Sequence, residues 1–125
     1  MNEDELSNQI TGAAIEVHKA MGPGLLEAVY EDCLAFELDE RHIPNARQKQ
    51  IPLAYKGHEL GSELRIDFLV GGLVVVELKS VETILPVHEA QVITYLKLTG
   101  CKLGLLLNFN VGRLKTGIRR FVLNL

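Results

Sequence analysis

The sequence predicts an α/β or α+β domain in which helices flank a mixed sheet. Two stretches with helical periodicity fill the first third of the chain, three strand-like stretches follow, and a further helix and strand come last. The 125 residues suffice for one compact core and are too few for two. With 47% apolar and 23% charged residues, the composition is that of a folded chain. We therefore expect a single domain over residues 1–125.

The first two predicted helices are separated by a Gly-Pro-Gly break at 22–24. Between Glu5 and Met21, apolar residues recur three and four positions apart, which is the helical period. These apolar residues are Leu6, Ile10, Ala13, Ala14, Val17 and Met21. The second helix is predicted to begin at Leu25 and to stop near Arg41, because Pro44 cannot continue a helix.

The strands are predicted from β-branched and alternating apolar stretches bounded by turn residues. Pro52 indicates that the first of them lies at an edge of the sheet. A helix follows Pro86 and ends at Gly100. The predicted strands cover residues 47–57, 59–70, 73–80 and 102–110, the helix covers 87–99, and residues 119–125 add one more strand.

The register of the hairpin around Gly71-Gly72 decides where its charged residues point. A two-residue loop would pair Val70 with Leu73 and put Asp67 and Glu77 on opposite faces. A three-residue loop pairs Val70 with Val74 instead, and only this register puts the alternating apolar residues of both strands on one face. Those residues are Ile66, Phe68 and Val70 on one strand and Val74, Val76 and Leu78 on the other. We therefore expect Asp67 opposite Glu77, with Lys79 on the same face.

Two carboxylates that face each other on adjacent strands destabilise the pair by a few tenths to about 1 kcal/mol. A hard divalent cation, which binds carboxylate oxygens and keeps waters for a substrate, turns that repulsion into coordination. On the following helix, Gln91 and Tyr95 lie one turn apart and can orient a water or a phosphate. The alternative is that Asp67, Glu77 and Lys79 lie on the wet face of an antiparallel hairpin, with Lys79 neutralising Glu77.

Asp67, then Glu77-Leu78-Lys79, then Gln91-x-x-x-Tyr95 form an ordered set that resembles the PD-(D/E)XK nuclease superfamily. More narrowly, "GLLEAVY" at 24–30 is similar to the pattern that names the GxxExxY protein family, and "HEAQVITYLKLTG" and "LGLLLNFN" resemble its later blocks. The resemblance runs nearly from end to end and implies a restriction-endonuclease-like αβββαβ core. The sequence departs from the superfamily's label at residue 66, where Ile stands in place of Pro.

The resemblance implies a metal-dependent nuclease that hydrolyses phosphodiester bonds in DNA. Asp67 and Glu77 would bind Mg²⁺ or Mn²⁺, with the Leu78 carbonyl as a further ligand. Glu27 would face the site from its helix and could join the ligands, and Lys79 would lie beside the attacking water. The implied catalytic residues are Glu27, Asp67, Glu77, Lys79, Gln91 and Tyr95.

The charge is distributed unevenly along the chain. Residues 1–42 hold ten acidic and two basic residues, a balance of −8, whereas residues 84–125 hold six basic residues and one acidic residue, a balance of +5. A basic tail of this kind can meet a polyanion such as DNA, although it is also typical of a solvated face. No apolar run reaches the length of a membrane span, and no export signal opens the chain, so we expect a cytoplasmic protein.

Other kinds of site find little support. The two cysteines and four histidines lack the spacing of a zinc site or a disulfide framework. The glycine-rich stretches lack the Lys-Ser/Thr of a phosphate-binding loop, and no serine lies in a nucleophile elbow.

Three hypotheses follow. The first is an Mg²⁺-dependent nuclease, acting alone, as a homodimer or with a protein partner. The second is a catalytically silent nuclease-like module that binds nucleic acid or protein through a basic tail of Arg113, Lys115, Arg119 and Arg120. The third is a structural protein whose hairpin charges are all surface ion pairs.

Overall fold

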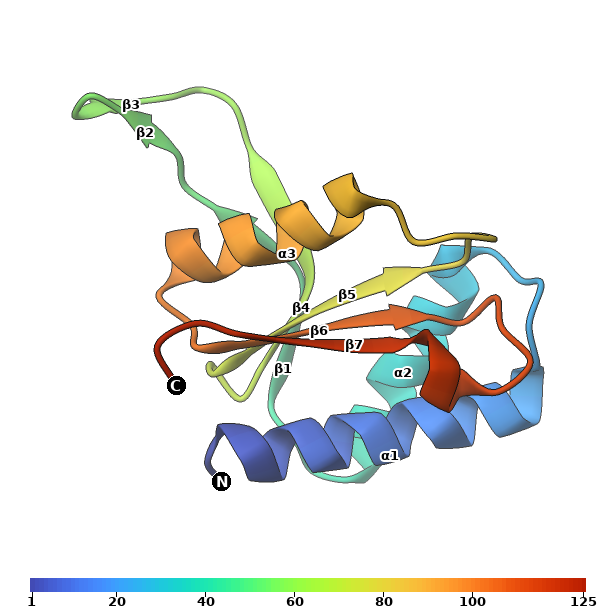
Figure 1. Ribbon diagram of the computed structural model, residues 1–125. Coiled ribbons are helices and arrows are strands. Elements are labelled where there is room, and N and C mark those ends of the chain that lie inside the picture. Colours follow the sequence, from blue (N-terminus) through green and yellow to red (C-terminus); the bar gives the residue numbers. More distant parts are fainter.

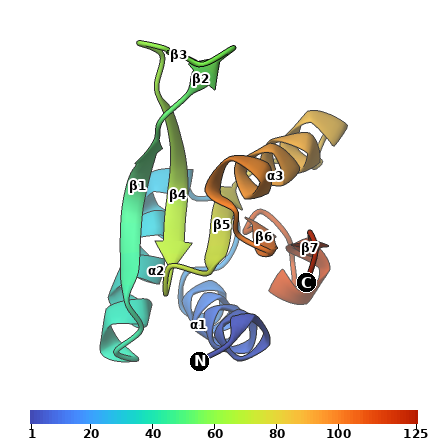
Figure 2. The same cartoon turned by 90° about the vertical axis from the view of Figure 1, so that its left-hand side faces the viewer.

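The structure, a computed structural model, describes all 125 residues as a mixed sheet with helices on both faces (Figure 1). α1 (Glu3–Met21) and α2 (Glu27–Glu40) cover one face, and α3 (Pro86–Thr99) covers the other (Figure 2). The sheet consists of β1 (Asn45–Ile51), β4 (Leu64–Val70), β5 (Val74–Lys79), β6 (Leu103–Asn108) and β7 (Ile118–Val122), in the order β1-β4-β5-β6-β7. β5 and β6 are parallel and the other neighbours antiparallel. The predicted α+β fold with a mixed sheet is therefore confirmed.

The helices begin and end at residues with clear local reasons. The Asn2 side chain caps α1 by accepting a hydrogen bond from the Glu5 N–H at 2.9 Å. Five of the six apolar residues predicted to face the core from this helix are buried, whereas Met21 is 42% exposed at its end. α3 begins with Pro86 and ends at Gly100, which adopts the left-handed conformation of a helix C-cap, as predicted.

The start of α2 differs from the prediction by two residues. Leu25 was expected to open the helix, but its N–H donates instead to the Tyr30 hydroxyl at 3.2 Å. Leu26 is extended and forms the N-cap, so the first helical residue is Glu27. Because of this, Glu27 is the first residue of the helix rather than its third.

The predicted strand at 47–57 is wrong in its second half. β1 ends at Ile51, because Pro52 has no N–H to continue the ladder. The chain then forms a short separate hairpin, β2 (Ala54–Tyr55) and β3 (His58–Glu59), which projects as an arm from the domain (Figure 1). The predicted edge position of β1 is confirmed.

The hairpin between β4 and β5 has the predicted register. Val70 pairs with Val74 across a three-residue loop in which Gly71 and Gly72 both have positive φ. Gly71 is also required by packing, since a Cβ there would lie 2.8 Å from the Leu6 side chain. Five of the six apolar residues expected on one face pack together in the larger core cluster, under α1 and α2.

Ile66 is the exception to that face. It packs in the smaller cluster beneath α3, with Ile51, Val75, Tyr95 and Leu96. Regular pairing between β4 and β5 ends at Phe68 and Val76. The side chains before Phe68 therefore need not keep the alternation of faces set by the pairing with β5. The expected common face therefore stops where the carboxylate residues begin.

The C-terminal part adds the strand that was predicted near residue 119. A short 3₁₀ helix, η1 (Leu114–Gly117), leads into β7, which pairs with β6. None of the helices combines the length and the apolar character needed to cross a bilayer.

Candidate active site

The carboxylates of Asp67 and Glu77 lie between the two strands that carry them. The Asp67 N–H donates to Glu77 Oε2 at 3.1 Å, and the Leu78 N–H donates to Asp67 Oδ2 at 2.8 Å. Side-chain oxygens thus accept main-chain donors at the point where the regular β4–β5 pairing has ended. The expected juxtaposition of Asp67 and Glu77 is present, and each carboxylate is held by the other's strand.

Burial makes the charge of Glu77 costly. Glu77 is only 8% exposed, and burial raises its pKa to about 9, with further upward contributions from hydrogen bonding to the Asp67 side chain and from the Asp67 charge. The Asp67 N–H and Lys79 act in the opposite direction but are weaker causes. A carboxyl group in this position holds a proton at neutral pH unless a cation takes its place.

The interpretation of these charges as a solvated hairpin face is therefore wrong for Glu77. None of the ion pairs in the structure involves Asp67, Glu77 or Lys79, so Lys79 does not neutralise Glu77 by direct contact. A structural protein whose hairpin charges are surface ion pairs does not match this geometry.

Glu27 approaches the same place from the N-terminus of α2. Burial raises the pKa of its carboxyl group, the nearby Lys79 opposes that shift, and the negative charge of Asp67 adds to it. Glu27, Asp67 and Leu78 together line a cavity of about 240 Å³. Glu27 and Asp67, which are far apart in the sequence, thus line the same small polar cavity.

The turn before α2 explains why Glu27 is held there. Gly24 has φ of 96°, a conformation that favours glycine. The Tyr30 hydroxyl donates to the Gly22 carbonyl at 2.5 Å and accepts the Leu25 N–H at 3.2 Å. Within "GLLEAVY", Gly24 therefore permits the turn, Glu27 lies at the site, and the Tyr30 hydroxyl forms a clamp that holds the turn against α2.

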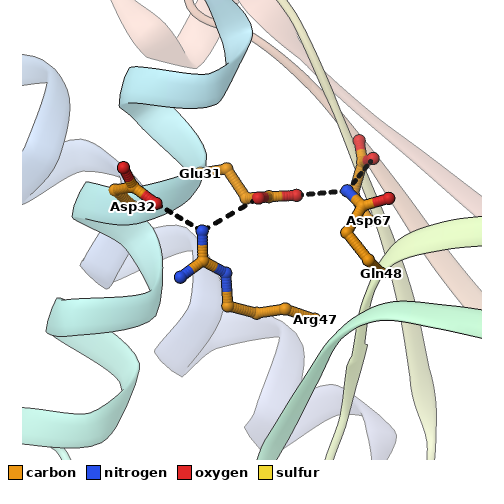
Figure 3. Close-up of polar contacts among 5 residues, drawn as sticks. All are labelled: Glu31, Asp32, Arg47, Gln48 and Asp67. Carbon is orange, nitrogen blue, oxygen red and sulfur yellow. Dashed lines mark hydrogen bonds and ion pairs between the residues drawn. The ribbon is translucent and has the colours of Figure 1, made fainter.

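A polar network that the sequence did not reveal supports Asp67 (Figure 3). The Gln48 amide donates to Asp67 Oδ1 at 3.2 Å and also to the Glu31 carboxylate. Arg47 donates to Glu31 at 2.9 Å and to Asp32 as well. The one available signal was that Glu31 lies four residues after Glu27, hence on the same helix face. Nothing in the pattern "RQKQ" indicated that Gln48, with φ of 48°, would turn toward Asp67.

Lys79 and Tyr95 lie close to the carboxylates. The Lys79 charge lowers the pKa of both Glu27 and Glu77, and its carbonyl accepts the Phe109 N–H at 2.9 Å. Tyr95, on α3, is 8% exposed; burial raises the pKa of its hydroxyl, and the charges of Glu77 and Asp67 raise it further. The structure thus brings together Glu27, Asp67, Glu77, Lys79 and Tyr95.

Gln91 is the predicted site residue that the structure does not connect to the others. Its side chain is exposed on α3 and makes no hydrogen bond within the chain. It remains one turn from Tyr95, as the spacing required.

The donor set fits a hard divalent cation only in part. No three His, Cys, Asp or Glu side chains cluster tightly enough to hold a metal by themselves, so Glu27 does not form a ready-made third carboxylate ligand. Glu27 is the first residue of α2, whereas the carboxylates of Asp67 and Glu77 accept hydrogen bonds from each other's strands. The pair itself fits the cation, because a buried carboxyl group beside a second carboxylate lacks a positive partner. Main-chain oxygen and water are the ligands that would complete such a site.

The largest cavity lies elsewhere. It measures about 700 Å³ and is lined by β1, the β2–β3 arm and the start of β4, with Gln48 and Arg47 at one end. Glu27, Asp67 and Glu77 do not line it, so the size of this cavity does not identify it as the active site.

The fold and this cluster define a class of protein: an α+β domain in which a strand hairpin presents two carboxylates beside a lysine, suited to hydrolysis of phosphate esters. A family model of the PD-(D/E)XK nuclease superfamily matches residues 4–121, and the chain belongs to this superfamily. Membership implies a nuclease and hence a nucleic-acid partner. A search of curated proteins found no match, and a search of solved structures also found none.

Proposed function

We propose that this protein is a Mg²⁺-dependent nuclease of the GxxExxY type that hydrolyses phosphodiester bonds in DNA, with Mn²⁺ as a substitute cation. The observation that carries the proposal is the Asp67–Glu77 pair, whose carboxylates accept hydrogen bonds from each other's strands, with Glu77 buried and without an ion-pair partner. The turn and clamp around Gly24 and Tyr30 support the GxxExxY assignment, because they give each residue of that pattern a physical task.

In this proposal Asp67, Glu77 and the Leu78 carbonyl hold the cation. When bound, Mg²⁺ would polarise the scissile phosphate and make a water molecule more acidic. The hydrogen bonds from the Leu78 N–H and the Gln48 amide orient Asp67, so its carboxylate needs little reorganisation.

The remaining residues act on the substrate. Lys79 stands near both Glu27 and Glu77, where its ammonium group would stabilise negative charge that develops on the phosphate. Glu27, whose pKa is raised, is suited to accept a proton from water or return one to the leaving oxygen. Tyr95 and Gln91 would hydrogen-bond phosphate or water at the rim of α3.

A second candidate is a nuclease-like module that binds nucleic acid or a protein without cutting it. One observation favours it: Glu27 does not complete a cluster of three metal ligands. A homodimer or a protein partner could supply what a single chain of this size lacks. We place either form in the cytoplasm, in keeping with the free thiols of Cys33 and Cys101.

The test is cleavage of a panel of single-stranded, duplex and branched DNA and RNA with Mg²⁺ or Mn²⁺. The nuclease proposal expects cleavage of DNA that requires the metal and that Glu77→Gln abolishes. Asp32→Asn, which alters an exposed carboxylate that contacts only Arg47, is the matched control and should retain cleavage. Cleavage of no substrate, with binding intact, would select the silent module instead.

A further inference from the structure

The basic residues of the C-terminal part fall into two groups that the sequence does not distinguish. Arg119 pairs with Glu89 at 3.2 Å, and Arg120 pairs with Asp4. Arg113 and Lys115 have no acidic partner. Only the second group is therefore free to bind an external anion.

Arg113 and Lys115 open onto a cavity of about 530 Å³ together with Lys19 and His18 from the end of α1. Gly22 and Pro23 line it as well, and no acidic residue does. Lys19, like the other two cations, is exposed and unpaired. Three uncompensated positive charges around one concave surface attract an anion more strongly than the same charges spread over a convex one.

The walls of this cavity are fixed. His18 is 8% exposed, and its Nε2 lies 2.8 Å from the Val111 carbonyl oxygen, which ties α1 to the turn that carries Arg113. Leu114 is buried in the larger core cluster and anchors η1 against α1 (Figure 1). The cations are thus presented by a preformed surface.

The cavity lies at the same end of the sheet as the Asp67–Glu77 site. Phe109 follows β6, donates its N–H to the Lys79 carbonyl, and stacks on Tyr30 with ring centroids 4.4 Å apart. Ser80, which follows Lys79, donates its hydroxyl to the Leu25 carbonyl at 2.5 Å. The carboxyl ends of β5 and β6, the turn before α2, and the turn bearing Arg113 are therefore joined by direct contacts.

We propose that the cavity of Lys19, Arg113 and Lys115 binds phosphate groups of a polynucleotide strand that extends beyond the cleavage site. This rests on the proposed nuclease function for the identity of the strand. The reason is charge: the cavity supplies three unpaired positive charges at a fixed position beside the catalytic site.

A pair of matched double variants tests the proposal. Arg113→Ala/Lys115→Ala removes two charges from the cavity, and Lys97→Ala/Lys102→Ala removes two charges from the end of α3 and the start of β6, at the other end of the sheet. All four side chains are exposed, and circular dichroism would check that both variants fold. Lys19→Ala, on α1, provides an independent change to the same cavity.

Binding is measured by fluorescence anisotropy of a labelled DNA strand with EDTA present, at salt concentrations from about 50 to 200 mM. We expect the cavity variant to weaken binding about tenfold and to reduce the slope of log K against log salt by roughly 1.4 to 1.8, the share of two phosphate contacts. The control variant should keep the wild-type slope. Equal losses in the two double variants, or no loss in either, would overturn the proposal.

A second arm separates a nucleic-acid phosphate from a small free anion. Inorganic phosphate is titrated into the wild-type protein and the cavity variant while the melting temperature is followed. Saturable stabilisation of the wild type alone, together with unchanged DNA binding by the variant, would identify a small-anion site and overturn the polynucleotide version.

Cleavage assays keep this inference distinct from the proposed function. If the wild type cuts DNA and the cavity variant binds it normally, the nuclease stands and the inference fails. If the wild type cuts nothing but the cavity variant loses affinity and salt dependence as expected, the inference stands and the catalytic proposal fails.

Discussion

Two neighbouring groups of carboxylates differ in whether a cation compensates their charge. Asp32, which is exposed, and Glu31, which is partly buried, both lie on α2 and share Arg47, whose pKa is raised by the hydrogen bonds to Asp32 and Glu31. Glu77 lies inside the sheet beside Asp67, with no cation in contact, and its pKa is raised to about 9. The carboxylates of α2 are thus paired with a cation, whereas Glu77 has none, which distinguishes a stabilising network from a buried group suited to bind a cation.

The largest expected effect is on cleavage. Asp67→Asn removes the charge of the proposed metal ligand while keeping its shape, so the rate of DNA cleavage should fall by at least about 10²- to 10³-fold. Asp32→Asn, in the compensated group, should change the rate by less than about twofold, because it contacts only Arg47. Single-turnover cleavage with saturating Mg²⁺ measures both, and equal losses in the two variants would remove the distinction.

Metal-linked stability comes next. Mg²⁺ that binds the folded protein alone should raise the free energy of unfolding by about 2.7 kcal/mol at a hundredfold excess over its Kd. Asp67→Ala should abolish the rise in melting temperature, and Asp32→Ala, at a carboxylate that contacts only Arg47, should retain it. A wild-type melting curve that is indifferent to both Mg²⁺ and Mn²⁺ would contradict the metal site.

The pH dependence of stability should isolate Glu77. Because its folded-state pKa is raised, the protonated carboxyl contributes stability below pH 4.5, the ordinary value, and that contribution is lost as the pH rises toward 9. Without metal, Glu77→Gln should therefore be more stable than the wild type at pH 8, by at least about 1.4 kcal/mol, the equivalent of one pKa unit. The advantage should vanish near pH 4.

Urea unfolding at several pH values, with EDTA, measures this difference. Glu31→Gln is the control and should show no such gain, since Glu31 already has cationic and amide partners. A Glu77→Gln variant that is less stable than the wild type at every pH would mean that the carboxylate is not strained by burial.

The smallest effect is expected for the ion pairs of Arg47 with Glu31 and Asp32. Arg47→Ala should lower the free energy of unfolding by roughly 0 to 1 kcal/mol, because exposed ion pairs contribute little. The loss should shrink further at high salt, as thermal melting with and without added NaCl would reveal. A salt-independent loss of several kcal/mol would place Arg47 in the structural core of the site.

Sequence patterns were sufficient wherever the controlling interaction is local. The helical spacing from Leu6 to Val17 and the Pro86 and Gly100 boundaries are properties of neighbouring residues, and the structure agrees with each. The register at Val70 and Val74 was predictable because a slip of one residue would have moved a whole apolar set to the other face. Pro52 predicts an edge strand, but the sequence pattern does not indicate that β1 ends at Ile51 or that the β2–β3 arm follows.

By itself, then, the sequence determined the α+β order of elements, the placement of Asp67 beside Glu77, and the ordered residues that the superfamily model matches over 4–121. Tertiary structure alone decided that Glu77 is buried, that Gln48 supports Asp67, and that Arg113 is free while Arg119 is paired. The physical reason is that periodicity and turn chemistry act between neighbours in the chain. Burial and charge compensation are instead sums over segments that meet only when the chain has folded.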